Sequence, residues 1–196
     1  GADTYKVAGQ GMTIKQQVLT PRSVLAGAVV ALAAGSLIGL VLLAHSGPLL
    51  LWIGVGGVLV AITYTAGPFP LAYNGLGEIA AGVFMGPLMV LGAYYVMARV
   101  YDPVPVLASA PVALMVAAIL HANNIRDYDA DKAVNKRTLA VLLGLRAARI
   151  EYALLVGGAY VTLALLVLAG VIPWLGLLAF VTLPAALRLL RVVSIS

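Results

Sequence analysis

The sequence contains no cysteine and little charge. Of its 196 residues, 12 are Lys or Arg and only seven are Asp or Glu, so 10% of the chain is charged. Without cysteine there can be no disulfide, no thiolate nucleophile and no cysteine-ligated metal site. Soluble globular domains carry about one quarter charged residues, so the shortage of charge also argues against a soluble domain.

Hydrophobic residues make up 63% of the chain and form six long apolar stretches. Each stretch has about 17 to 23 residues, which suffices for a helix to cross a membrane. They are residues 23–44, 48–64, 76–98, 103–122, 149–169 and 172–190. Continuous apolar runs of this length exclude transmembrane β-strands, whose residues alternate in polarity. The sequence therefore predicts an all-α, multi-pass transmembrane helical bundle that forms one domain over residues 1–196 and contacts the lipid bilayer.

The basic residues follow the ends of these spans. The net charge is +5, but the basic residues form no stripe with interleaved aromatics, so we expect no nucleic-acid partner. Lys and Arg are concentrated before the first span, between the fourth and fifth spans, and at the end of the sixth. The positive-inside rule then predicts that both ends of the chain and the connections 65–75 and 123–148 are cytoplasmic in a cell-membrane protein.

Glycine and proline predict where helices bend or approach one another. Gly35 with Gly39, and Gly82 with Gly86, are small residues four apart, a spacing that allows close approach of helix backbones. The Gly86-Pro87 pair is expected to kink the third span, because proline cannot donate a backbone hydrogen bond.

Three of the seven acidic residues lie in one short segment, RDYDADK, at residues 126–132. In a calcium-binding loop, Asp127, Asp129 and Asp131 would be positions 1, 3 and 5. That loop requires Gly at position 6 and Glu at position 12, where this chain has Lys132 and Thr138. The calcium loop is therefore disfavoured. A solvated charged loop is the simplest alternative, but acidic residues contribute little to membrane orientation, so topology does not explain them.

A helix that continues the fourth span out of the membrane gives the aspartates different directions. If residues 121–144 are helical, Asn123, Asp127 and Asp131 share one face at four-residue spacing, and Asp129 faces away. Two carboxylates four apart repel unless a cation lies between them. Mg²⁺ is typically held by one or two carboxylates together with substrate phosphates. The pattern therefore favours a metal-bound diphosphate, with nearby basic residues binding further phosphate oxygens.

A diphosphate at the surface of an apolar bundle points to an isoprenyl diphosphate whose tail lies between the helices. Mg²⁺ would stabilise the leaving diphosphate as an allylic carbocation forms. Such chemistry usually needs a second acidic cluster, and Asp3 is the only acidic residue before the first span.

Two segments resemble the UbiA-type intramembrane prenyltransferase family. NNIRDYDADKAVNKRTLAVLLG, residues 123–144, is similar to the family's second aspartate motif. In the branch that prenylates 1,4-dihydroxy-2-naphthoate, this motif reads approximately N-N-x-R-D-x-x-x-D-x-x-x-G-K-x-T-L-A. YTAGPFPLAYNGLGEIAAGVFMGPLMVLGAYYV, residues 64–96, resembles the same branch's connection between helices four and five, followed by helix five.

The resemblance implies a nine-helix fold, in which the six spans would be helices three to eight. Residues 1–3 resemble the end of the family's first aspartate motif, so we expect an internal fragment that is incomplete at both ends. By position, Asp127 and Asp131 would be the catalytic pair that binds Mg²⁺ and diphosphate, and Asp3 would be a further metal ligand. The resemblance assigns substrate binding to Asn123, Asn124, Arg126, Lys132, Lys136, Tyr64 and Tyr73.

Four other polar residues have simpler explanations or depart from the family pattern. Glu78 would interact favourably with the dipole of a helix that begins near it, with Asn74 as a candidate cap. His121 is expected to pack or to make a buried hydrogen bond rather than to catalyse. Asn135 stands where the family usually has Gly, and Asn tolerates the left-handed conformation. Asn74 stands where many relatives carry a basic residue.

The resemblance implies a Mg²⁺-dependent prenyltransferase that joins a polyprenyl diphosphate to an aromatic acceptor. The expected acceptor is 1,4-dihydroxy-2-naphthoate, as in menaquinone biosynthesis. Other acceptors remain open, namely 4-hydroxybenzoate, homogentisate or a glycerol phosphate ether. A membrane transporter gated by the aspartates is a further alternative, although no ionisable residue lies in the middle of a predicted span, where an ion path usually has one.

Overall fold

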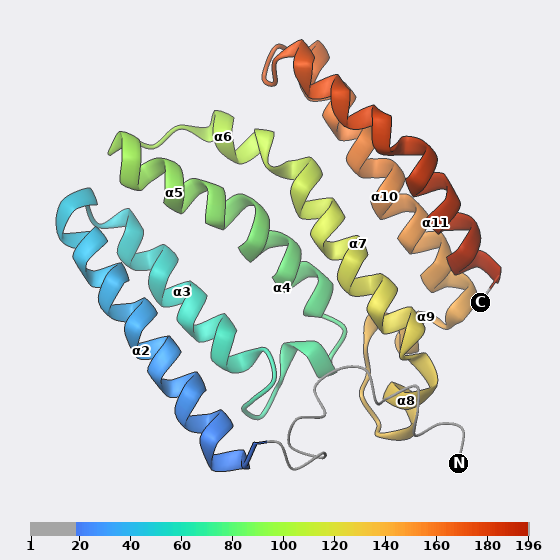
Figure 1. Ribbon diagram of the computed structural model, residues 1–196, viewed down its shortest axis with the longest axis horizontal. Coiled ribbons are helices and arrows are strands. Elements are labelled where there is room, and N and C mark those ends of the chain that lie inside the picture. Colours follow the sequence, from blue (N-terminus) through green and yellow to red (C-terminus); the bar gives the residue numbers. More distant parts are fainter. Residues whose placement is uncertain (1–18, 196) are drawn as a thin grey trace.

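The computed structural model describes residues 19–195, and most of this range is helical (Figure 1). In chain order the elements are α2 (Pro21–Ser46), α3 (Leu49–Thr63), the 3₁₀ turn η1 (Leu71–Tyr73), α4 (Gly77–Val83), the π-helical turn η2 (Phe84–Leu88), α5 (Met89–Ala98), α6 (Pro103–Ala108), α7 (Ala110–Arg126), α8 (Tyr128–Ala133), α9 (Leu139–Leu143), α10 (Leu145–Leu168), the 3₁₀ segment η3 (Trp174–Thr182) and α11 (Leu183–Ile195).

Five of these segments are long and apolar enough to cross a membrane. They are Pro21–Ser46, Gly77–Ala98, Pro103–Arg126, Leu145–Leu168 and Trp174–Val193. The remaining predicted span is α3, whose 15 residues extend about 22 Å at 1.5 Å per residue. The all-α, multi-pass membrane bundle is therefore confirmed. The predicted count of six full spans becomes five long helices and one short helix within residues 19–195.

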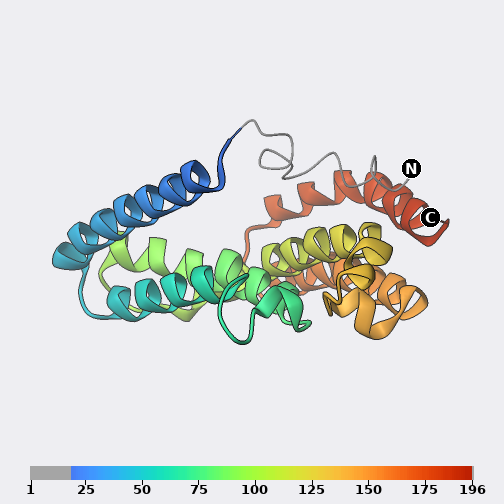
Figure 2. The same ribbon diagram turned by 90° about the horizontal axis from the view of Figure 1, so that it is seen from below.

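The segments run side by side in chain order, with α2 at one edge of the bundle and α11 at the other (Figure 1). Seen from below, α2 and α11 tilt out of the layer that the other helices form (Figure 2). The connection between α3 and α4 lies at the same end of the bundle as α8 and α9 (Figure 1). Segments that the charge pattern assigned to one side of a membrane are therefore together in space.

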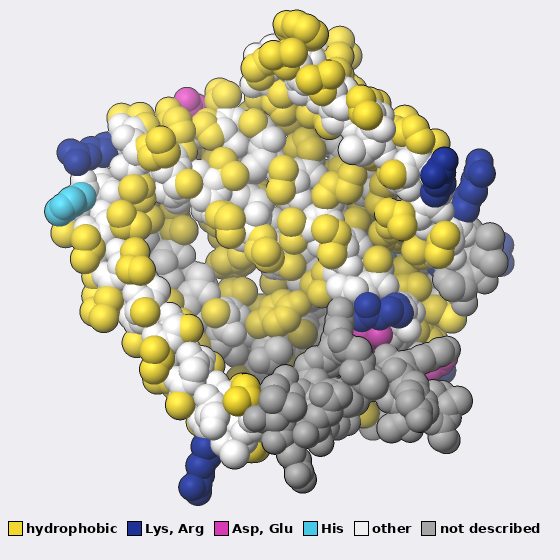
Figure 3. Space-filling model, viewed as in Figure 1, with side chains coloured by type: hydrophobic (Ala, Val, Ile, Leu, Met, Phe, Trp, Pro, Cys, Tyr) yellow, Lys and Arg dark blue, Asp and Glu magenta, His cyan; other side chains and the backbone are white. Residues whose placement is uncertain are grey.

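The buried core lies between α7, α9 and α10. The most deeply buried members of this apolar cluster are small, since Ala118 is 2% exposed and Ala140 and Ala148 are fully buried. Tyr152 and Tyr160 of α10 fill the space around them. In contrast, no residue of α2 or α3 is buried. Apolar side chains cover much of the face in Figure 3, and most of the charged side chains on this face lie toward its edges.

The third span departs from α-helical geometry where Gly86 and Pro87 were expected to kink it. Phe84–Leu88 forms a π-helical turn between α4 and α5, because Pro87 lacks the N–H that an α-helix would use. A Cβ placed on Gly86 would lie 2.7 Å from the Cβ and 2.9 Å from the Cα of Ala113. On Gly82 it would lie 3.0 Å from the carbonyl oxygen of Ala113. The predicted close approach is confirmed for this pair.

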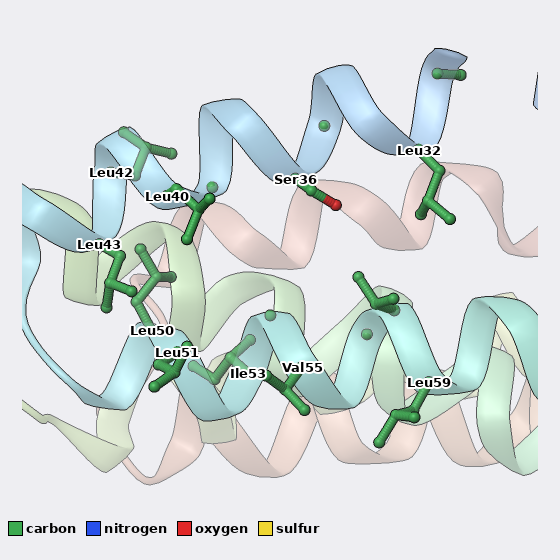
Figure 4. Close-up of a pocket in the computed structure, with 16 residues that line it drawn as sticks. Leu32, Ser36, Leu40, Leu42, Leu43, Leu50, Leu51, Ile53, Val55 and Leu59 are labelled. Atoms are coloured by element: carbon green, nitrogen blue, oxygen red, sulfur yellow. The ribbon is translucent and has the colours of Figure 1, made fainter. Parts of the chain in front are cut away.

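Within residues 19–195, the same prediction is wrong for Gly35 and Gly39. A Cβ on either residue would meet none of the described atoms within 4 Å, because both line an apolar cavity of about 610 Å³ between α2 and α3. Figure 4 shows Leu43 of α2 projecting toward α3 beside Leu50. Bulky leucines therefore keep these two helices apart, and the glycines face the space that remains.

We predict that Gly86→Ala lowers the free energy of unfolding by about 1–3 kcal/mol, because overpacking a tight contact forces side chains and backbone to shift. Gly39→Ala is the matched control. It should be neutral or slightly stabilising, since Ala favours a helix over Gly by about 1 kcal/mol and the cavity has room for the methyl group. Reversible unfolding in detergent, followed by circular dichroism, measures both. Equal stabilities for the two variants would contradict the packing described for Gly86.

Candidate active site

The aspartate segment continues α7 with one interruption. α7 ends at Arg126 and α8 begins at Tyr128, with Asp127 between them at φ −92° and ψ 12°. The helical hydrogen bonds persist across this break. The N–H of Asp127 donates to the carbonyl of Asn123 at 2.9 Å, and that of Asp131 donates to the carbonyl of Asp127 at 2.8 Å. The predicted four-residue spacing is therefore kept as far as Asp131.

The prediction of one helix through residue 144 is wrong beyond Ala133. Asn135 adopts a left-handed conformation with φ 55°. Its N–H donates to the carbonyl of Lys132 at 3.2 Å, and the N–H of Lys136 donates to the carbonyl of Asp131 at 2.9 Å. This pair of bonds is a Schellman motif, which ends a helix with a left-handed residue. Asn135 thus performs the turn for which the family usually has Gly.

The three aspartates differ in exposure. Asp131 is 8% exposed, Asp127 is half-buried and Asp129 is exposed. The exposure of Asp129 agrees with the expectation that it faces away from the other two.

Asp127 is paired with its neighbour Arg126. The Nε of Arg126 donates to Oδ1 of Asp127 at 2.8 Å, and an Nη donates to Oδ2 at 2.9 Å. These hydrogen bonds hold the pKa of the Asp127 carboxyl below its ordinary value. Partial burial acts in the opposite direction, and the positive charges of Arg126 and Lys136 act in the same direction as the bonds. Asp127 is therefore an anion at neutral pH.

Asp131 is paired with Lys136, whose Nζ donates to both carboxylate oxygens at 3.1 Å. The same Nζ lies 5.9 Å from the centroid of the Tyr73 ring. One residue on, the N–H of Arg137 donates to the carbonyl of Tyr73 at 3.2 Å. The connection between α3 and α4 is therefore joined to the connection between α8 and α9, and three predicted site residues, Tyr73, Asp131 and Lys136, come together.

Other predicted site residues lie elsewhere. Lys132 is exposed, and its Nζ lies over the Tyr128 ring at 5.7 Å. Tyr64 caps the end of α3, and its hydroxyl is 3.4 Å from where a Cβ on Gly77 would stand. Asn123 is half-buried one turn before Asp127. Asp3 lies outside the described residues.

Asn124 belongs to a second polar cluster, which the sequence alone did not reveal. Its Nδ2 donates to Oε1 of Glu78 at 2.8 Å. The Nδ1 of His121 lies 3.0 Å from the same oxygen, and its Nε2 lies 2.9 Å from the carbonyl of Ala148. A carbonyl can only accept, so Nε2 carries a proton and donates to it. The buried hydrogen bonds expected for His121 are confirmed.

The expected position of Glu78 in the first turn of a helix is confirmed, because α4 begins at Gly77, but the expected Asn74 cap is wrong. Leu76, not Asn74, is the N-cap of α4, and the side chain of Asn74 instead donates to the carbonyl of Pro70 at 2.8 Å. Glu78 is 3% exposed and interacts with α7 rather than with solvent at a helix end. The only local indication of this cluster in the sequence was the spacing of His121 and Asn124, which lie three residues apart on one helix. Their partner lies more than 40 residues earlier.

Within the described part of the chain, no three His, Asp or Glu side chains form a metal-ligand cluster. The donors present fit a different arrangement. Asp127 and Asp131 are hard oxygen ligands one helical turn apart, each beside a basic residue. Mg²⁺ typically keeps several waters and takes one or two carboxylates together with substrate phosphates. The residues therefore fit a cation shared with a phosphate ligand better than one held by protein alone.

The fold and this site define a class: a multi-pass helical membrane protein with paired acidic and basic groups at one end of its bundle. Within that class, the chain belongs to the UbiA prenyltransferase family, whose model matches residues 12–195.

Several similar proteins are named 1,4-dihydroxy-2-naphthoate octaprenyltransferase. The one from Mycobacterium tuberculosis is 39% identical over 188 residues, which cover 96% of this chain and 63% of the relative. The one from Bacillus subtilis is 32% identical over 192 residues, which cover 97% of this chain and 61% of the relative. The chain thus spans about three fifths of the length of these relatives. No solved structure matches it.

We predict that Asn135→Val destabilises the protein by about 1–2 kcal/mol, because a side chain branched at Cβ is strained in the left-handed region. Asn135→Gly is the matched control and should be at least as stable as the wild type, since Gly adopts this conformation freely. Unfolding in detergent measures both variants. Equal tolerance of Val and Gly would contradict the Schellman geometry.

Proposed function

We propose that the protein is a Mg²⁺-dependent aromatic prenyltransferase that transfers a polyprenyl group from its diphosphate to 1,4-dihydroxy-2-naphthoate, a step of menaquinone biosynthesis. One observation carries the proposal: two carboxylates, each paired with a cation, lie at one end of an apolar bundle. Similarity to naphthoate prenyltransferases over nearly the whole chain supports this acceptor. Membership of the family disfavours the transporter alternative.

In this proposal, the aspartates hold the cation and the basic residues hold the phosphates. Asp127 and Asp131 would bind Mg²⁺, which when bound supplies positive charge to the leaving diphosphate. Arg126 would turn from Asp127 to the diphosphate, because its planar fork matches phosphate oxygens as well as it matches a carboxylate. Lys136, between Asp131 and Tyr73, would contribute a second cation.

The reaction would separate charge at the end of the bundle. The bond between the allylic carbon and the diphosphate oxygen breaks, and the diphosphate leaves with the electron pair. The electron-rich ring carbon that bears the carboxylate attacks the allylic cation. A carbon–carbon bond forms as the carboxyl group leaves as CO₂, and the product is a prenylated naphthoquinol. The apolar helices would exclude water from the cation, and the end that carries the aspartates would face the cytoplasm, as the charge pattern predicts.

Substitution of the individual aspartates tests the site in the full-length protein. Asp127→Ala and Asp131→Ala should each lower kcat for prenyl transfer at least about 100-fold, a typical loss when charge stabilisation is removed. Asp129→Ala is the matched control, because it removes an exposed carboxylate from the same segment. It should keep kcat close to the wild-type value. A loss for Asp129→Ala as large as for the other two would contradict the assignment.

A panel of acceptors tests the reaction itself. Labelled polyprenyl diphosphate is incubated with the full-length protein and 1,4-dihydroxy-2-naphthoate, 4-hydroxybenzoate, homogentisate or a glycerol phosphate ether, with Mg²⁺ or with EDTA. We expect labelled product from the naphthoate alone, and only with Mg²⁺. Product from another acceptor would contradict the proposed substrate, and no product from any acceptor would contradict the proposed activity.

A further inference from the structure

Glu78 and His121 connect three helices at a place where no aspartate of the candidate site lies. Glu78 belongs to α4, His121 and Asn124 belong to α7, and the carbonyl that His121 contacts belongs to Ala148 of α10. His121 is completely buried, and Glu78 is 3% exposed. The prenyl-transfer chemistry described above uses neither side chain.

A gain in folding stability does not by itself explain this buried cluster. Removing a carboxylate and an imidazole from water costs several kcal/mol per ion, and apolar replacements of a buried ion pair are often equally stable or more stable. The second oxygen of Glu78, Oε2, is buried with no hydrogen-bond partner among the described residues. The same holds for Oε2 of Glu151, which lies 3.7 Å from Nε2 of His121.

Hydrogen bonds differ from apolar contacts in having direction. The His121 ring is held on one edge by α4 and on the other by α10. Asn124, three residues later on the same face of α7, is held by the same Glu78 oxygen. The contacts of His121 and Asn124 with Glu78 therefore fix both the rotation of α7 about its axis and its axial position relative to α4.

The aspartate pair follows these contacts directly along the chain. Asp127 lies six residues after His121, about 9 Å along the helix. Its N–H binds the carbonyl of Asn123, the residue before Asn124, and Asp131 follows in the same hydrogen-bond series. A rotation of α7 would therefore carry both carboxylates with it.

We propose that Glu78 and His121 are positioning residues for the candidate active site: through Asn124 they set the rotation of α7, and so the direction in which Asp127 and Asp131 face. The inference rests on the proposed function, because it requires that the two aspartates share one cation. It predicts that changes at Glu78 weaken cation binding and slow prenyl transfer even in a protein that remains folded.

The test compares three variants of the full-length protein well below their unfolding temperatures. Glu78→Met removes the acceptor of both hydrogen bonds at constant length. Glu78→Gln keeps an amide oxygen at the position of Oε1, the atom that both Asn124 and His121 contact. Tyr160→Phe is the matched control, since it removes a hydrogen bond of 2.7 Å to Thr182 from a side chain that, like Glu78, belongs to a buried residue. Two readouts are kcat for prenyl transfer and Mn²⁺ affinity in the presence of inorganic diphosphate, by electron paramagnetic resonance.

We expect Glu78→Met to lower kcat by roughly 10- to 100-fold, the scale of loss when reacting groups are displaced by about 1 Å, and to weaken Mn²⁺ binding. Glu78→Gln should restore most of both values, and Tyr160→Phe should lower the unfolding temperature with little effect on either. A folded Glu78→Met protein with wild-type kcat and Mn²⁺ affinity would overturn the inference. So would a loss in Tyr160→Phe equal to that in Glu78→Met.

A second substitution covers the case in which Glu78→Met does not fold. His121→Gln keeps a donor for the carbonyl of Ala148 but loses the contact with Glu78, and it should show the same weakening of Mn²⁺ binding. Wild-type Mn²⁺ affinity in His121→Gln would refute the inference. Failure of the proposed function has a different result, because the wild-type protein would then transfer no prenyl group to any acceptor.

Discussion

Hydrocarbon offers no hydrogen-bond partners, and this constraint organises the whole chain. Backbone groups inside a bilayer must pair within their own segment, so the apolar stretches are helices. Charged side chains must lie where water is available, so they gather near helix ends. The acidic and basic residues of the candidate site are thus brought together by the same constraint that makes the rest of the bundle apolar. The Glu78–His121 contact is an exception, and its burial is the reason to assign it a role.

Predictions that depended on local pattern were largely correct. The apolar stretches correctly predicted where the long helices lie, because length and hydrophobicity can be read from one segment without knowledge of the rest of the chain. The spacing from Asn123 to Asp131 survived the break at Asp127, because the hydrogen bonds continue through it. Family resemblance gave the family and the residues of the second motif. The departure from Gly at Asn135 was noted and the residue does adopt the left-handed conformation, but the end of the helix at this point was not predicted.

Features that depend on distant residues could not be predicted in this way. Gly35 with Gly39 and Gly82 with Gly86 share one spacing, yet only the second pair faces a neighbour as small as Ala113. Glu78 read alone was an ordinary first-turn acid. Its partners on α7 lie more than 40 residues later, and no short segment contains that information. Sequence pattern therefore found the aspartates but not the side chains that hold their helix in place.

The contacts of Tyr73 have a consequence for motion. Its ring lies near the Nζ of Lys136 and its carbonyl accepts from the N–H of Arg137, so two connections that are far apart in the chain are linked by one side-chain contact and one backbone hydrogen bond. A ligand that draws Lys136 toward itself also removes a contact from the connection between α3 and α4. The backbone bond from Arg137 to Tyr73 does not involve that side chain, so it could persist while the contact with Lys136 is lost.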